Sequence, residues 1–224
     1  FNIPLTFYGE PNGIIGLGRW ESFMDSSDQE INRSVIEQYI GMNGYRITDI
    51  MQYDKSIKAQ DVIPYVYPKK EELKTDIKAI QLGHFFPWDF KKNIEIIKEY
   101  GWQTSETNTE HSFTNFEDLD CGFMPMHQYF KFIKYGFGRA TDHASYEIRQ
   151  GRMNRKEAKD LIIEYDGKLP RKYFKEFLEF LNITEDHFFK TRDRFTNPVL
   201  FKKDENNNYM RGNDDNLFLQ KFWF

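Results

Sequence analysis

The chain has 224 residues, a formal net charge of −4 at pH 7, 39% hydrophobic residues and 17% aromatic residues. It is long enough to form one large domain, and its composition predicts a core rich in aromatic rings. No apolar run approaches the roughly 18 residues that span a bilayer, and the start does not resemble a signal peptide, so we expect a cytoplasmic protein with no membrane partner. The single cysteine, Cys121, excludes an internal disulfide and a multi-cysteine zinc site, and an isoelectric point near 5.8 gives no general basic field, so we expect no nucleic-acid partner.

An apolar run at residues 3–8 predicts a buried strand that ends at Gly9. Because a buried strand normally has neighbours, and because the sequence lacks an initiator Met, we expect a fragment of a longer chain. The glycine-rich loop "GEPNGIIGLG" follows, and such loops let backbone N–H groups approach a phosphate, although a plain connection fits equally well. It matches neither the Walker nor the dinucleotide-binding pattern. Glu10 is more specific, because open α/β sheets bind ligands at the C-terminal ends of their strands.

The next elements follow an α/β pattern. Capping and periodicity predict a helix at residues 27–41. Residues 43–70 are irregular around their prolines, although "YRITDIMQY" fits a short helix, and we interpret this region as an insertion over a cleft. A second strand is predicted at residues 78–86 and a helix at residues 89–101. We therefore assign residues 1–120 to the C-terminal portion of a parallel-sheet α/β domain.

The second half of the chain changes character. Residues 121–195 are predicted to be a helical region, in which Asn154 and Glu157 have the spacing of a capping box and Thr184 caps a later helix. Residues 196–224 are predicted to form an extended tail. Its last residues are too apolar for water, so we expect them to dock on the body of the protein or on a partner.

A polar strip lies between two aromatic-faced helices of this region. Arg139, Asp142 and His143 are three and four residues apart, so on a helix they share one face. A solvated, salt-bridged helix surface would have the same pattern. The preceding Gly-x-Gly step, and Arg149 and Arg152 beyond the strip, favour a ligand, because an arginine fork can hold two phosphate oxygens. His143 suits an acid, a base or a phosphate ligand, and the other histidines show no metal-ligand spacing with it, so we assign no metal ligands.

Two stretches carry a family resemblance. "LGHFFPWDFKKNIEIIKEYGW" and "YFKFIKYGFGRATDHASYEIRQGRMNRKEAKDLIIEYDGKLP" resemble the C-terminal part of the bacterial N-acetyl sugar amidotransferases, a family that includes lipopolysaccharide O-antigen and pseudaminic or legionaminic acid biosynthesis proteins. The likeness covers nearly the whole chain, and the motif from Tyr135 to Met153 is long enough to be specific. "IPLTFYGE" corresponds to a family strand that ends in Gly-Glu-Asn, whereas here Pro11 separates Glu10 from Asn12.

The resemblance implies the C-terminal part of an adenine-nucleotide alpha-hydrolase-like fold, the ATP pyrophosphatase type, with a parallel sheet followed by a helical region. It implies that ATP and Mg²⁺ activate the acetamido carbonyl of a nucleotide-linked N-acetyl sugar as an adenylate, after which ammonia displaces AMP and leaves an acetamidino group. The family's Ser-Gly-Gly-x-Asp-Ser loop and cysteine cluster are not in this sequence. Ammonia is expected from a separate glutaminase through an ammonia-conducting, cyclase-like subunit.

The resemblance also suggests roles for residues of this sequence. The nucleotide or adenylate edge of the sheet is assigned to Gly9, Glu10 and Asn12. Phosphate or sugar contact is assigned to the polar strip and the arginines after it: Arg139, Asp142, His143, Arg149 and Arg152. Within this set, Asp142 and His143 are the catalytic candidates, and His143 is hypothesised to assist proton removal from the attacking ammonia. Asp120 and Cys121 either border the same cleft or begin a buried helix.

Two other classes of function stay open. A tRNA-modifying relative in the same superfamily would need a basic surface, against which the isoelectric point near 5.8 argues. A non-catalytic fragment or interaction module would use the helical half and the apolar tail only to dock partner subunits, such as the glutaminase and the ammonia channel.

Overall fold

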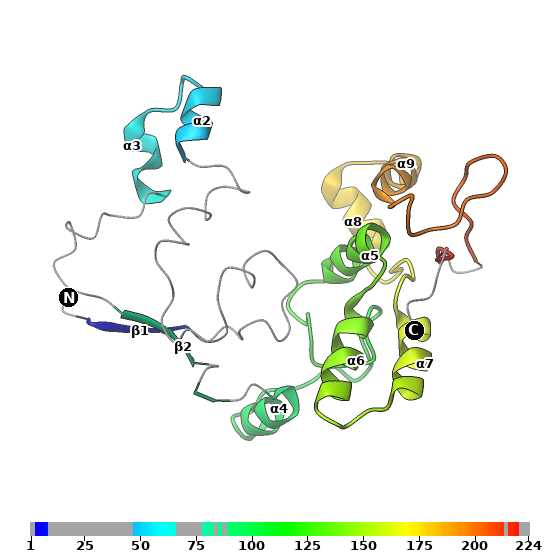
Figure 1. Ribbon diagram of the computed structural model, residues 1–224, viewed down its shortest axis with the longest axis horizontal. Helices are drawn as coiled ribbons and strands as arrows, with labels where there is room; N and C mark the ends of the chain where they lie inside the picture. Colours follow the sequence, from blue (N-terminus) through cyan, green and yellow to red (C-terminus); the bar gives the residue numbers. More distant parts are fainter. Residues whose placement is uncertain are drawn as a thin grey trace. The chain divides into compact units, whose positions relative to one another are not determined.

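The computed structural model describes residues 3–8, 47–65, 78–82, 85–86, 89–212 and 215–219. The chain divides into two compact units, Phe1–Glu95 and Ile96–Phe224, which are described separately (Figure 1). The glycine-rich loop and the helix predicted at residues 27–41 lie outside the described residues. The expected domain boundaries after residues 120 and 195 stay predictions.

The first unit contains two parallel strands, β1 (Leu5–Tyr8) and β2 (Lys78–Gln81), which pair in register from one end to the other (Figure 1). The strand expected at residues 3–8 is therefore confirmed. Its predicted burial is wrong, because Leu5 and Phe7 are 40% and 56% exposed. Within the described residues β2 is the only strand beside β1. A doubly covered parallel sheet would need more elements, and the α/β fold class stays a prediction.

Short helices form the described part of the expected insertion, namely α2 (Ile47–Tyr53), α3 (Ala59–Val62) and the 3₁₀ helix η2 (Ile63–Tyr65). The first of these confirms the helix expected in "YRITDIMQY". Asp54 follows it and accepts hydrogen bonds from the backbone N and the Oγ of Ser56, at 2.9 and 2.6 Å. This side-chain turn favours an end to the helix at this point.

The helix predicted at residues 89–101 is observed as α4 (Phe90–Glu99). The Asp89 carboxylate accepts a hydrogen bond from the backbone N of Lys91 at 3.0 Å and so caps the first turn. Gly101 follows the helix with φ of 89°, a conformation that glycine adopts without strain. Residues next to each end of α4 therefore determine where this helix begins and ends.

The helical region of the second unit consists of α5 (Met124–Tyr135), α6 (Arg139–Arg149), α7 (Arg155–Tyr165), α8 (Phe174–Leu181) and α9 (Glu185–Phe195) (Figure 1). The capping box before α7 is confirmed: Asn154 Oδ1 accepts from the backbone N of Glu157, and the Glu157 carboxylate accepts from the backbone N of Asn154, both at 3.0 Å. Thr184 also caps α9 as predicted, since its Oγ1 accepts from the backbone N of His187 at 3.2 Å.

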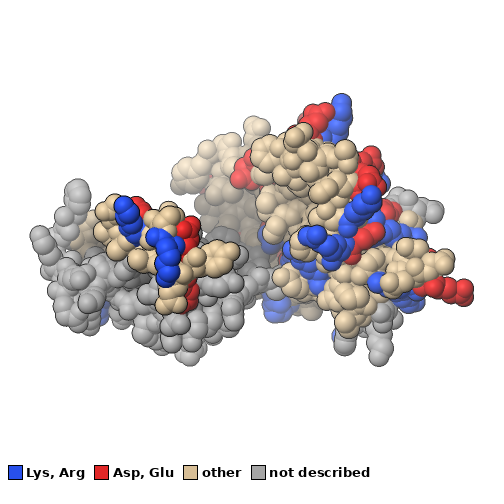
Figure 2. All heavy atoms as spheres, turned by 90° about the horizontal axis from the view of Figure 1, so that it is seen from above, with Lys and Arg blue, Asp and Glu red and all other residues tan. Residues whose placement is uncertain are grey.

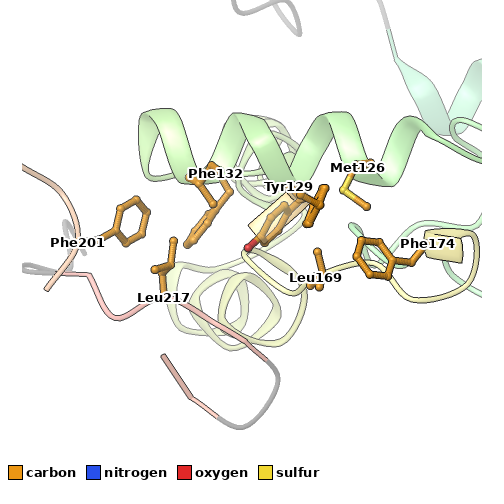
Figure 3. Packing of buried hydrophobic residues seen from close by; sticks show 9 residues of the cluster. Met126, Tyr129, Phe132, Leu169, Phe174, Phe201 and Leu217 are labelled. Carbon is orange, nitrogen blue, oxygen red and sulfur yellow. The ribbon is translucent and has the colours of Figure 1, made fainter. Parts of the chain in front are cut away.

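Aromatic rings dominate the core of the second unit, as its composition suggested (Figure 3). The buried cluster joins α5, α8, α9 and the C-terminal segment through Met126, Tyr129, Phe132, Ile133, Leu169, Phe174, Phe188, Phe201 and Leu217. Phe174 and Phe188 of this cluster meet edge to face with ring centroids 5.0 Å apart. A smaller cluster of Ala144, Ala158 and Ile162 packs α6 against α7.

The C-terminal segment is not an isolated tail. In its described residues, three antiparallel bridges fold it back on itself: Phe201 with Leu219, Lys203 with Tyr209, and Arg211 with Leu217. Phe201 is fully buried in the core and Leu217 is buried beside it (Figure 3). Ion pairs from Arg192 to Asp215, and from Arg211 to Asp193, tie the segment to α9. Docking on the body is thus confirmed for residues 217–219, and the residues after them lie outside the described part.

Charged side chains of both signs are interspersed on the face drawn in Figure 2. In the part of the chain that the structure describes, no helix has the length and apolar character needed to cross a membrane.

Candidate functional site

The polar strip lies on α6, and a carboxylate from another helix fixes the start of this helix. Asp166 follows α7 and accepts hydrogen bonds from the backbone N of Gly138 at 2.8 Å and of Ala140 at 3.0 Å, and from Thr141 Oγ1 at 2.6 Å. Burial raises the pKa of Asp166, while these hydrogen bonds oppose the rise. The carboxylate occupies the place where a helix N-terminus would otherwise bind an anion. The amide of the Gly-x-Gly step therefore holds a protein carboxylate.

Gly138 permits this approach. A Cβ atom at this position would lie closer than 3.0 Å to Asp166 Oδ1, a distance that real Cβ atoms essentially never show. The glycine is therefore explained by the capping carboxylate, with no ligand required.

Glu117 connects two residues of the strip. Arg139 donates from Nε to Oε2 and from Nη2 to Oε1 of Glu117, at 2.8 and 2.7 Å, in a bidentate pair. His143 Nε2 makes a short hydrogen bond to the same Oε2. Because a carboxylate only accepts, this nitrogen carries the proton. His143 is buried, with 3% of its surface exposed, and the rings of Phe113 and Phe116 both lie edge-on to it.

The surroundings of Glu117 keep it ionised. Burial raises the pKa of this carboxyl, but the hydrogen bonds and positive charges of His143 and Arg139 outweigh burial and hold the pKa at about 2. Burial lowers the pKa of Arg139, and the hydrogen bond and charge of Glu117, with the charges of Asp142 and Asp118, reverse this and raise it. The group is thus a buried, charged network.

Asp142 extends the network to α5. It makes a short ion pair with Lys131, and Arg139 Nη1 lies 3.9 Å from its Oδ2. Burial raises the pKa of Asp142, and the Lys131 ammonium partly opposes that rise. Lys131 also lies over the ring of Phe137, with Nζ 4.8 Å from the ring centroid. The Glu117 network, as we call it, comprises Glu117, Lys131, Arg139, Asp142 and His143.

The other predicted arginines lie at the far end of α6. Arg152 donates from Nε and Nη2 to the two carboxylate oxygens of Glu147, both at 2.9 Å, and its guanidinium lies 5.6 Å from the centroid of the Tyr146 ring. Arg149 is in the last turn and exposed. The structure therefore brings Arg139, Asp142 and His143 together and places Arg149 and Arg152 near the opposite helix end.

The sequence-based set missed Glu117, Lys131 and Asp166. Glu117 lies in "NFEDLDC", a stretch considered only for Asp120 and Cys121, and 22 residues separate it from Arg139. Periodicity cannot detect such long-range partners. The predicted nucleotide-binding residues Gly9, Glu10 and Asn12 lie outside the described residues.

A pocket of about 420 Å³ lies in the same unit. Its charged and aromatic lining comes from Glu110, His111, Asp118, Lys172 and Tyr173, and Cys121 also lines it. His111 Nε2 hydrogen-bonds to Asp118 Oδ2 at 2.8 Å. Asp118 directly follows Glu117, so the pocket and the Glu117 network share one stretch of backbone. Among the described residues, no cluster of three His, Cys, Asp or Glu side chains could hold a metal ion.

Comparison with known protein families gives a match for part of the chain. Residues 110–213 match the family described as LPS biosynthesis protein WbpG-like, C-terminal domain. The matched segment is slightly less than half of the chain and contains the Glu117 network, all the helices from α5 to α9, and most of the pocket lining. It supports the expected relation to lipopolysaccharide biosynthesis proteins. A comparison with curated proteins gave no match.

Proposed function

We propose that this chain is the C-terminal part of an ATP-dependent amidotransferase of lipopolysaccharide biosynthesis. The observation that carries the proposal is the match of residues 110–213 to the C-terminal domain of WbpG-like LPS biosynthesis proteins. The resemblance of the motif from Tyr135 to Met153 to N-acetyl sugar amidotransferases supplies the reaction.

The proposed reaction replaces the carbonyl oxygen of a sugar N-acetyl group with nitrogen. The amide oxygen attacks the α-phosphorus of ATP, and pyrophosphate leaves. Ammonia then adds to the activated carbon and loses a proton, and AMP departs with the former amide oxygen. Adenylation is needed because an amide oxygen is otherwise a poor leaving group. The product is an acetamidino group on the nucleotide-linked sugar.

Magnesium would neutralise charge on the departing pyrophosphate. The described residues do not build a site for it, since no cluster of three ligating side chains occurs among them. We therefore assign none of them to Mg²⁺ and derive no step through it. Contact with the nucleotide stays proposed for Gly9, Glu10 and Asn12.

Within the described part, we propose two kinds of role. Arg149 is suited to phosphate contact, because it is exposed and arginine binds phosphate oxygens in pairs. Arg152 stays proposed for the same contact, in which phosphate would displace the Glu147 carboxylate that holds its Nε and Nη2. Arg139 and Asp142 are better suited to holding His143, since they are largely buried and engaged with Glu117 and Lys131. His143 would take the ammonia proton only if Glu117 moves or accepts the proton in its place.

The test uses the product of the whole open reading frame, supplied with ATP, Mg²⁺, an ammonium salt and nucleotide-linked N-acetyl sugars. AMP release that requires both the sugar and ammonium is expected. His143→Ala should slow it strongly, whereas the matched control His127→Ala should not, because His127 is an exposed residue of α5 outside the network. Unchanged acetamidino formation in His143→Ala would remove His143 from the mechanism.

A non-catalytic docking role is favoured by one observation. Phe180 and Leu181, at the end of α8, are strongly exposed for apolar residues. One outcome would be that the product of the whole open reading frame releases no AMP while the chain still binds the expected glutaminase or ammonia-channel subunits. In that case the non-catalytic docking role would replace the amidotransferase proposal.

A further inference from the structure

We draw no further inference here: the strongest candidate, the exposed apolar surface that Phe180 and Leu181 form at the end of α8 beside the ring of Phe123, carries none, because nothing in the described part of the structure shows what covers it.

Discussion

Arg139 and Glu117 form a bidentate ion pair with both hydrogen bonds under 3 Å, at 2.8 and 2.7 Å, although 22 residues separate them in sequence. The pair anchors the segment before α5 to the first turn of α6. His143 shares one oxygen of the same carboxylate, so a single side chain orients two residues of the predicted site. The geometry of the site therefore depends on Glu117.

Glu117→Gln should destabilise the protein. It removes the nearest counter-charge of the largely buried guanidinium of Arg139, which keeps Asp142 at 3.9 Å, and breaking a buried ion pair typically costs about 3–5 kcal/mol. The free energy of unfolding in urea measures the loss. Glu179→Gln is the matched control, because the exposed pair of Lys175 and Glu179 should contribute below about 0.5 kcal/mol. Equal losses in the two variants would show that the Glu117 pair does not stabilise the fold.

The depressed pKa of Glu117 predicts an acid-sensitive contribution to stability. The folded pKa is about 2, below the ordinary value of 4.5, so the contribution is complete above pH 4.5 and is lost as the pH falls towards 2. As the pH is lowered from 4.5 towards 2, the urea concentration at the midpoint of unfolding should fall more steeply in the wild type than in Glu117→Gln. The comparison separates Glu117 from Asp142, whose raised pKa acts in the opposite direction. Parallel curves for the two proteins would contradict this assignment.

Gly138→Ala should displace the capping carboxylate of Asp166. The residue has φ of −116°, which alanine tolerates, so the cost arises from the clash of the new methyl group with Asp166. We expect a loss of about 2 kcal/mol, in the range of overpacked sites. Asp166→Ala removes the same cap, so the double variant should cost clearly less than the sum of the single variants. Strict additivity would mean that the two residues act independently.

The docking of the C-terminal segment can be tested with two phenylalanines. Phe201→Ala empties a fully buried position in the ring cluster and should cost about 3–5 kcal/mol. Phe218→Ala, in the same segment but 47% exposed, should cost less than about 1 kcal/mol. Thermal unfolding of both variants provides the comparison. A small effect of Phe201→Ala would show that the segment detaches readily from the core.

Local signals predicted much of the helical half. The capping box of Asn154 and Glu157, the cap at Thr184 and the shared face of Arg139 and His143 each depend on residues a few positions apart. Such relations are visible in sequence because a helix has a fixed period. The strand at residues 3–8 was also found, but its burial depends on elements far away in the chain.

The residues that hydrogen-bond to the predicted site residues could not be identified from local sequence patterns. Glu117 reaches His143 across 26 residues, and Asp166 reaches Gly138 across 28. These contacts exist because the helices pack side by side, which no periodicity encodes. From the sequence, the Gly-x-Gly step before α6 and the arginines in and after the polar strip were interpreted as signs of a ligand. The structure supplies protein carboxylates for Gly138, Arg139 and Arg152.

The central claim is that this chain belongs to an enzyme that replaces a sugar amide oxygen with nitrogen. The product of the whole open reading frame is incubated with ATP, Mg²⁺, ¹⁵N-labelled ammonium and a nucleotide-linked N-acetyl sugar, and the sugar is then analysed by mass spectrometry. The account predicts one ¹⁵N atom in an acetamidino group, formed together with AMP. An unlabelled sugar that keeps its acetyl oxygen, across a panel of nucleotide-linked N-acetyl sugars, would contradict it.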